Sequence, residues 1–225
     1  MYGNVADFCE CFFNPYNLVM EYLWLALMWC AWCAIHSGTI SMTATDFFKR
    51  KLGSAYRFFR LFFNVTAVAT LIPVIIYAES IRGGIIFDSI GLLRVIQMVF
   101  LAAGIALFIA GIMHYDPLQF FGMRQIMSGS SHGTLTEHGG IDASGMLGVT
   151  RHPWYLGALF LVWSNWMKAY DVSSVLSIAI LSAYLVIGTI LEEGKLITEL
   201  GDEYRKYQKS VSMLFPIKYL SSKIR

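Results

Sequence analysis

Long apolar runs constrain this chain more than any other feature. Four of them are close to the length of about 20 residues that a bilayer-spanning helix needs: Leu18–Ile35, Phe62–Tyr77, Val95–Ile112 and Val172–Leu191. A shorter run, Leu156–Trp166, begins after Pro153 and nearly touches the last run, so we expect it to form the first arm of a helical hairpin. The sequence therefore predicts an all-α integral membrane protein with about five transmembrane helices.

The composition agrees with a membrane setting. Of the 225 residues, 56% are hydrophobic and only 14% are charged, whereas about a quarter of the residues are charged in an average soluble domain. The formal net charge of +2 is too small to indicate nucleic-acid binding. Residues 1–16 lack a basic segment and contain Asp7 and Glu10, so we do not expect a cleaved signal peptide.

The positions of Lys and Arg predict the orientation. Basic residues are concentrated in the first connection, around residues 49–60, in the loop 113–153 and in the tail after residue 204. Cytoplasmic loops of membrane proteins carry the excess of Lys and Arg. We therefore expect these three segments in the cytoplasm, with the N-terminus outside and the C-terminus cytoplasmic, which also requires an odd number of spans.

The segment VTRHPWYLG places two basic residues at the start of the short apolar run. Pro153 suits the first position of a helix, and a residue before proline is kept out of the α region, so His152 is expected at the cap with Arg151 just outside. The free N–H groups and positive dipole at such a helix start favour an anion. Tyr155 follows His152 by three residues and shares its side of the first turn.

Two carboxylates, Glu192 and Glu193, directly follow the last apolar run. Burying a carboxylate at the end of a membrane span costs energy. A carboxylate at the C-terminus of a helix would also interact unfavourably with the helix dipole. The compensating cation is either Arg151 or His152 of the facing hairpin arm, or the ammonium group of a ligand. Each motif alone also fits an ordinary role, as a topology anchor or a solvated helix end. Together they predict a receptor for a zwitterion such as the amino acid end of a ligand.

The stretches TRHPWYLG and EEGKLITELGDEYRKYQKSVSMLFP resemble the C-terminal signature of the isoprenylcysteine carboxyl methyltransferase superfamily. In that family an RHP-x-Y-x-G element and a glutamate pair form the pocket for S-adenosyl-L-methionine, which ends in an amino acid zwitterion. The resemblance implies a single membrane methyltransferase domain, with spans in residues 1–112 and a cofactor-binding loop, hairpin and tail in residues 113–225. The cofactor-binding residues that it implies are Gly148, His152, Tyr155, Gly157, Glu192 and Glu193.

Upstream, the stretches AIHSGTIS, YRFFRLFFN and DPLQFFGMRQI are similar to elements of the methanethiol S-methyltransferase branch. This likeness implies methylation of a small hydrophobic thiol, such as methanethiol, to a sulfide. The thiolate is the nucleophile, and a nearby cation favours it, so the candidate catalytic residues are Arg151, His36 and Arg124. Arg151 is the first choice because it lies beside the cofactor motif. Ser212 departs from the family pattern, which commonly has a proline there.

Other acceptors and one other class of protein stay open. A prenylcysteine carboxylate or a phospholipid amine competes with the small thiol as methyl acceptor, each of them a lipid-like molecule within reach of the bilayer. A haem-binding membrane protein related to zeta-carotene isomerase would instead use His36 as an axial ligand. We do not expect a metal site at Cys30, Cys33 and His36, because thiols within an apolar span behave as small hydrophobic groups. The sequence predicts no oligomeric state.

Overall fold

The computed structural model describes residues 15–81, 87–88, 90–114, 118, 121–128, 143–167 and 169–224. Its elements in chain order are α2 (Pro15–Ile40), α3 (Met42–Leu52), the 3-10 helix η1 (Gly53–Phe58), α4 (Phe59–Ser80), β1 (Phe87–Asp88), α5 (Leu92–His114), α7 (Met123–Ser128), the 3-10 helix η2 (Gly145–Gly148), α8 (Pro153–Trp166), β2 (Ala169–Tyr170), α9 (Val172–Ser210) and α10 (Ile217–Ile224). The strands β1 and β2 pair antiparallel over two residues each.

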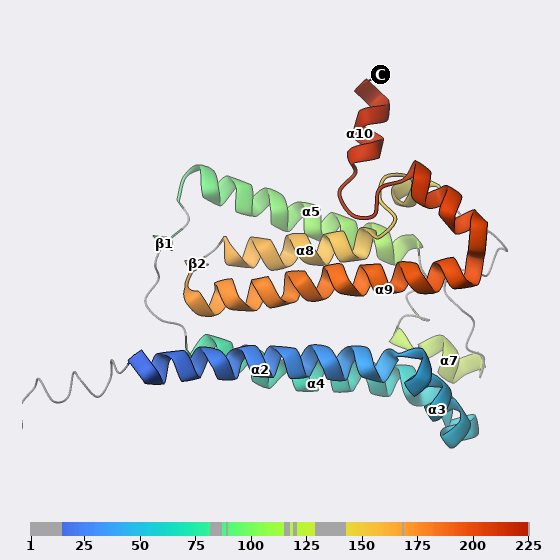
Figure 1. Ribbon diagram of the computed structural model, residues 1–225, viewed down its shortest axis with the longest axis horizontal. Coiled ribbons are helices and arrows are strands. Elements are labelled where there is room, and N and C mark those ends of the chain that lie inside the picture. Colours follow the sequence, from blue (N-terminus) through green and yellow to red (C-terminus); the bar gives the residue numbers. More distant parts are fainter. Residues whose placement is uncertain are drawn as a thin grey trace, which may run out of the picture.

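The long helices form two layers that run side by side (Figure 1). One layer contains α2 and α4, and the other contains α5, α8 and α9, with α8 between its two neighbours. The layers are joined where α9 packs on α2 and α4, around the buried side chains of Leu25, Trp29 and Val74. Four of the described helices, α2, α4, α5 and α9, are long and apolar enough to cross a membrane. The predicted all-helical membrane fold is confirmed.

The fifth expected span is the 14-residue helix α8. At 1.5 Å per residue it is about 21 Å long, shorter than the hydrocarbon core of about 30 Å. It forms the predicted hairpin with α9 through β2 and Asp171. The Asp171 carboxylate is buried and caps α9, accepting hydrogen bonds from the Ser174 backbone N–H at 3.0 Å and the Ser174 hydroxyl at 2.6 Å.

The last helix extends well beyond the expected end at Leu191. It continues to Ser210 because the polar stretch that follows is rich in Glu, Lys and Leu, which are good helix formers. At Gly201 the backbone takes φ 57° and ψ −129°, a conformation that glycine adopts readily. There the helix turns, and its end folds back toward the start of α8 (Figure 1). The glutamate pair thus lies inside a helix, and the expected opposition from a C-terminal dipole does not apply.

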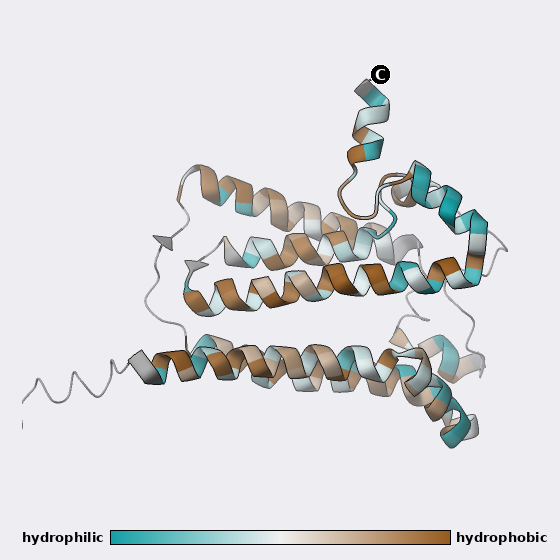
Figure 2. Ribbon diagram, in the orientation of Figure 1, coloured by the Kyte–Doolittle hydropathy of each residue, from teal (hydrophilic) through white to brown (hydrophobic). Residues whose placement is uncertain are grey.

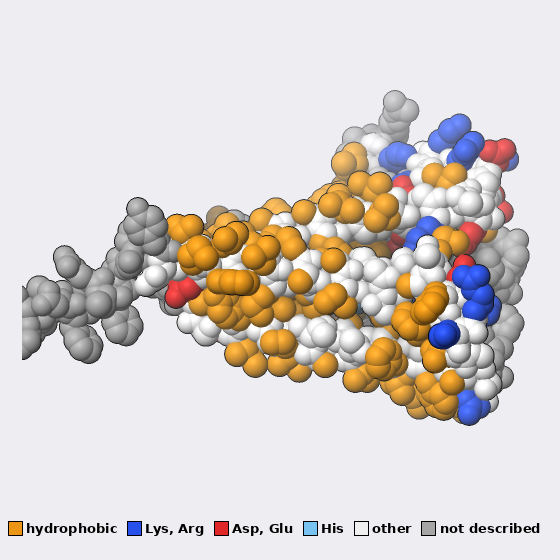
Figure 3. Space-filling view, turned by 60° about the horizontal axis from the view of Figure 1, so that its bottom comes forward, with side chains coloured by type: hydrophobic (Ala, Val, Ile, Leu, Met, Phe, Trp, Pro, Cys, Tyr) orange, Lys and Arg blue, Asp and Glu red, His pale blue; other side chains and the backbone are white. Residues whose placement is uncertain are grey.

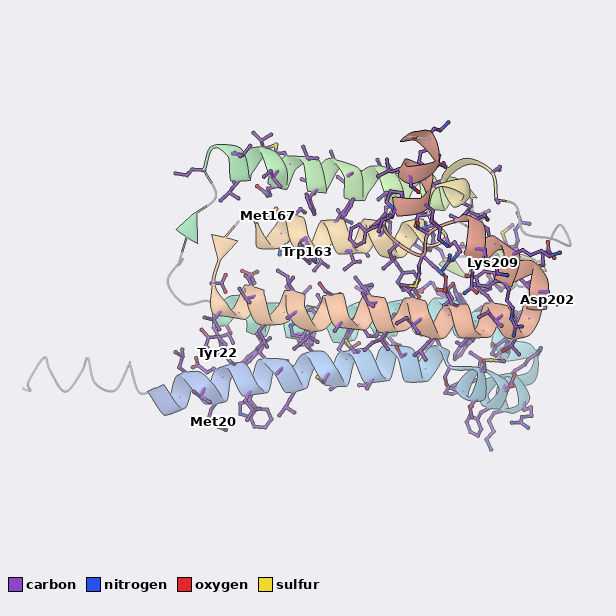
Figure 4. The ribbon with its side chains drawn as sticks, turned by 45° about the horizontal axis from the view of Figure 1, so that its top comes forward. Met20, Tyr22, Trp163, Met167, Asp202 and Lys209 are labelled. Carbon is purple, nitrogen blue, oxygen red and sulfur yellow. The ribbon has the colours of Figure 1, made fainter. Side chains whose placement is uncertain are left out.

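Charged side chains gather at one end of the bundle. Figure 2 shows apolar residues along the long helices, and Figure 3 shows Lys and Arg at the end that carries α3. Asp202 and Lys209 of α9 mark this same end, opposite Met20 and Trp163 (Figure 4). The first connection and the C-terminal segment therefore share one end, as the predicted orientation requires. The side of the membrane on which this end lies stays a prediction.

The packing of α5 on α8 depends on glycines. A Cβ atom on Gly157 would lie 3.1 Å from the carbonyl oxygen of Gly104, and a Cβ on Gly104 would lie 2.9 Å from the side chain of Leu161. On Gly111 a Cβ would overlap the ring of Trp154. Small residues allow membrane helices to approach closely in this way, so the position of α8 depends on the missing side chains.

We expect Gly157→Leu to destabilise the protein by about 1–3 kcal/mol, because the new side chain would be forced into a close-packed helix interface. The matched control is Gly194→Leu in α9, where nothing among the described residues lies within 4 Å of an added Cβ. Thermal unfolding in detergent would measure both changes. Equal unfolding temperatures for the two variants would contradict this packing role.

Candidate functional site

The start of α8 is held by the segment that follows α9. The Arg151 N–H donates to the carbonyl oxygen of Ser212 at 3.0 Å, and the His152 N–H donates to that of Met213 at 3.2 Å. Pro153 takes the first position of α8 with His152 before it, as the sequence predicts. The Ser212 hydroxyl accepts a hydrogen bond from the Lys218 N–H at 3.0 Å. The two segments matched to the family signature therefore form one structural unit.

Glu193 lies at the centre of this unit. Its Oε1 accepts hydrogen bonds from Arg151 Nε at 2.7 Å, His152 Nε2 at 3.2 Å and the Tyr204 hydroxyl at 3.3 Å, and its Oε2 accepts one from Gln208 Nε2 at 2.9 Å. A second guanidinium nitrogen, Arg151 Nη2, lies 2.5 Å from the same Oε1. We call Arg151, His152, Glu193, Tyr204 and Gln208 the Glu193 cluster. Four side chains from α9 and the start of α8 thus satisfy one carboxylate.

Arg151 is fixed within the protein. Its Nη1 donates to the backbone carbonyl oxygens of Gln208, at 3.1 Å, and Val211. Only 6% of the Arg151 side chain is exposed to solvent, and only 12% of the Glu193 side chain. A charge pair removed from water in this way needs good geometry and further hydrogen bonds to offset its desolvation, and both are present. The geometry favours a structural role for Arg151 over the thiol-activating role that we expected first.

Glu192 is placed differently from its neighbour. Its side chain keeps 38% of its exposure, and its Oε2 lies 4.0 Å from His152 Nδ1. Adjacent residues of a helix point about 100° apart, so only one of the two carboxylates can enter the Glu193 cluster. Glu192 therefore presents an accessible carboxylate at the edge of that cluster.

His152 lies between the two glutamates and is buried. Burial lowers the pKa of its imidazole, although the charges of Glu192 and Glu193 oppose that shift. A neutral ring that carries its proton on Nε2 donates to Glu193 and keeps Nδ1, the nitrogen nearest Glu192, as an acceptor. The ring of Tyr155 packs edge-on against His152, with 5.7 Å between the centroids. The predicted grouping of Tyr155 with His152 is present.

The two expected glycines have local structural reasons. A Cβ on Gly148 would lie 2.8 Å from the carbonyl oxygen of Ala143, and the Tyr207 hydroxyl donates to the carbonyl oxygen of Leu147 at 2.6 Å, which ties η2 to α9. Gly157 faces α5 rather than the Glu193 cluster. Cofactor contacts of these glycines stay predictions. Residues 139–142 of the expected cofactor-binding loop lie outside the described residues.

Neither Arg124 nor His36 is a member of the Glu193 cluster. Arg124 is on α7, which packs against η1, and its side chain is exposed. His36 is on α2, surrounded by aromatic rings. Cys30 and Cys33 of the same helix are free thiols. Over the residues that the structure describes, no group of three or more His, Cys, Asp or Glu side chains could hold a metal ion.

Sequence reasoning missed the parts that Tyr204 and Gln208 play. Both lie in the stretch that resembles the family signature, but they are 11 and 15 residues from Glu193. Only the turn of α9 at Gly201 brings them back to it. A glycine within a polar, helix-favouring stretch, Gly201, was the available signal, and it does not reveal which side chains meet.

Known proteins resemble this chain over part of its length. The profile of the family described as "Protein of unknown function (DUF1295)" matches residues 44–211. The chain is 38% identical over 68 residues to the methanethiol S-methyltransferase of Pseudomonas deceptionensis, covering 30% of the chain and 25% of that enzyme. It is 41% identical over 66 residues to methanethiol S-methyltransferase 1 of Bradyrhizobium diazoefficiens, covering 29% of the chain and 22% of that enzyme.

A third relative, the methanethiol S-methyltransferase of Mycobacterium tuberculosis, is 32% identical over 98 residues, covering 44% of the chain and 39% of that enzyme. The match thus spans less than half the length of each of these curated relatives. No solved structure is a significant match. The resemblance to the methanethiol S-methyltransferase branch is confirmed by these relatives.

We expect Glu193→Gln to destabilise the protein by about 3 kcal/mol, because it leaves the buried Arg151 guanidinium without its counter-charge. Glu192→Gln should change stability by less than about 0.5 kcal/mol, as expected for an accessible side chain. Chemical denaturation in detergent would compare the two adjacent variants directly. Equal losses of unfolding free energy would contradict the different placement of the two carboxylates.

The lowered pKa of His152 predicts a pH dependence of stability. Below about pH 6.5 the His152 imidazole of the unfolded chain binds a proton. The buried imidazole of the folded protein binds that proton only at a lower pH. The unfolding free energy should therefore fall as the pH drops through that window, and be unaffected by His152 above it. Denaturation curves between pH 8 and pH 5 should show a smaller decline for His152→Gln than for the wild type. Parallel declines would show that His152 does not cause the effect.

Proposed function

This chain belongs to the DUF1295 family, and we propose that it is an S-adenosyl-L-methionine-dependent membrane methyltransferase that methylates a small thiol such as methanethiol. The supporting observation is the pairing of an accessible Glu192 carboxylate with the N-terminus of α8 beside His152. The names of the curated relatives support methanethiol as the first acceptor to test.

The residues fit the amino acid end of the cofactor. Its carboxylate suits the positive end of the α8 dipole, where His152 forms no side-chain cap and turns its ring toward Glu193. Its ammonium suits Glu192, whose carboxylate is accessible, whereas Glu193 is already satisfied by four side chains. The site thus offers a helix N-terminus that favours an anion next to a carboxylate that favours a cation, as binding of a zwitterion requires.

The cofactor, when bound, supplies a methyl group on a sulfonium, which is reactive without further activation. The chain's own residues have to hold the reactants in line, which lowers the barrier by several kcal/mol in well-oriented reactions. The Arg151–Glu193 pair contributes by fixing its neighbours. Glu193 accepts a hydrogen bond from the His152 ring, and its helix position sets the direction of Glu192.

The membrane setting suits such an acceptor, because small thiols and their sulfide products partition into lipid. We place the end of the bundle that carries α3 and the Glu193 cluster in the cytoplasm, where the cofactor is made. The basic residues Lys49, Arg50 and Lys51 of α3 at this end support that orientation. The N-terminus then lies outside.

Calorimetry with S-adenosylhomocysteine, the demethylated cofactor, tests the site without turnover. We expect Glu192→Gln to weaken binding by about 30-fold or more, because it removes the partner of a ligand ammonium in a partly desolvated site. The matched control is Glu199→Gln, an exposed carboxylate of the same helix. Wild-type affinity in Glu192→Gln, or no binding by the wild type, would remove this assignment.

Gas chromatography of dimethyl sulfide formed from methanethiol then tests the acceptor. Parallel assays with prenylcysteine and phosphatidylethanolamine distinguish the alternatives. We expect turnover with methanethiol, and exclusive turnover of either lipid-like acceptor would contradict the thiol assignment.

A further inference from the structure

Three helices from both layers meet around His36. Its ring stacks on Trp32 of α2 with 5.1 Å between centroids and 24° between planes. It lies 4.8 Å from the ring of Phe63 in α4 and 6.3 Å from that of Tyr184 in α9. The hydroxyls of Tyr184 and Ser37 share a hydrogen bond of 2.9 Å. We call these five residues the His36 cluster.

His36 has a feature that its aromatic neighbours do not explain. Its Nδ1 atom is buried and has no hydrogen-bond partner in the part of the chain that the structure describes. Nearly all buried polar atoms of native proteins are paired, so an unpaired one calls for an explanation. The faces of Trp32 and Phe63 offer it no donor. A bound molecule that carries an acidic hydrogen would satisfy this nitrogen.

Helix α9 connects the His36 cluster with the proposed cofactor site. Tyr184, Gly188 and Glu192 follow one another at intervals of four residues and so share one side of the helix. A Cβ on Gly188 would lie 3.5 Å from the ring of Tyr155, an ordinary contact distance, so Tyr155 of the proposed cofactor site packs against this same side of α9. Eight residues of helix place Tyr184 and Glu192 about 12 Å apart along the axis. The His36 cluster and the proposed cofactor site around Glu192 and Tyr155 thus face the same stretch of α9.

We propose that the His36 cluster binds the methyl acceptor and that His36 is the base that takes the proton of a small thiol. The inference rests on the proposed methyltransferase function and deepens it. Sulfur makes favourable contacts with aromatic rings, and here the rings of Trp32, Phe63 and Tyr184 surround the base. Arg151, the alternative activating group, is fixed by Glu193 and two backbone carbonyls.

The step balances with groups already named. His36 takes the thiol proton at Nδ1, in the tautomer that carries its own proton on Nε2. The electron pair of the S–H bond stays on the acceptor sulfur and forms the new S–C bond, while the bond between the methyl group and the sulfonium breaks and its pair stays on that sulfur. The sulfide leaves, and His36 releases the proton to water.

His36→Gln tests the base directly. The variant keeps a polar group but cannot take a proton, so turnover of methanethiol should fall about 100-fold or more. Its affinity for S-adenosylhomocysteine should equal that of the wild type. At higher pH a larger fraction of methanethiol is already ionised in solution and needs no base. The activity of the variant should therefore rise steeply toward pH 9, whereas that of the wild type should not. A structural role alone would not produce such recovery.

Tyr184→Phe tests the acceptor site independently of His36. Calorimetric titration of methanethiol into protein saturated with S-adenosylhomocysteine should show binding about tenfold weaker for this variant. The matched control is Tyr77→Phe, near the opposite end of the bundle. It also removes a tyrosine hydroxyl that bonds another helix, because the Tyr77 hydroxyl donates to the Glu21 carbonyl oxygen at 3.3 Å. The control should bind methanethiol as the wild type does.

Two results would overturn the inference: turnover of His36→Gln within about threefold of the Tyr77→Phe control, or equal methanethiol affinity in Tyr184→Phe and that control. Failure of the wild type to bind S-adenosylhomocysteine would overturn the proposed function as well, so the two failures are distinguishable.

Discussion

The buried ion pair between Arg151 and Glu193 is the interaction on which the rest of the site depends. It joins the start of α8 to the middle of α9, and hydrogen bonds to the same two side chains attach the folded-back end of α9 and the segment after it. A buried carboxylate without these partners would be costly. The turn at Gly201 supplies them by returning Tyr204 and Gln208 to Glu193.

This arrangement divides the work between two adjacent carboxylates. Glu193 is used inside the protein, and the helix then directs Glu192 outward, beside His152 Nδ1. A recognition group placed on a fixed neighbour loses little freedom when a ligand binds, which favours affinity. The pair thus consists of Glu193, which has a structural role, and Glu192, which precedes it by one position and is the proposed ligand contact.

Local signals in the sequence predicted the elements well, and contacts between distant residues less well. The apolar runs identified the spans, and Pro153 identified the start of α8 with His152 before it. The end of α9 was misplaced, because a drop in hydrophobicity after Leu191 does not interrupt helix propensity. The sequence also did not reveal that Gly157 packs against Gly104 of α5. Which of two helix faces needs a glycine depends on the packing partner, and a single sequence does not show it.

A double-mutant cycle on binding tests most directly whether Glu192 meets the ligand ammonium. The ligands are S-adenosylhomocysteine and its analogue without the α-amino group, and the proteins are the wild type and Glu192→Gln. If the carboxylate and the ammonium interact, the substitution weakens binding of the first ligand but leaves the affinity for the analogue about unchanged, a non-additive result. If the substitution weakens both ligands by the same factor, Glu192 acts elsewhere, and the division of roles between the two glutamates is contradicted.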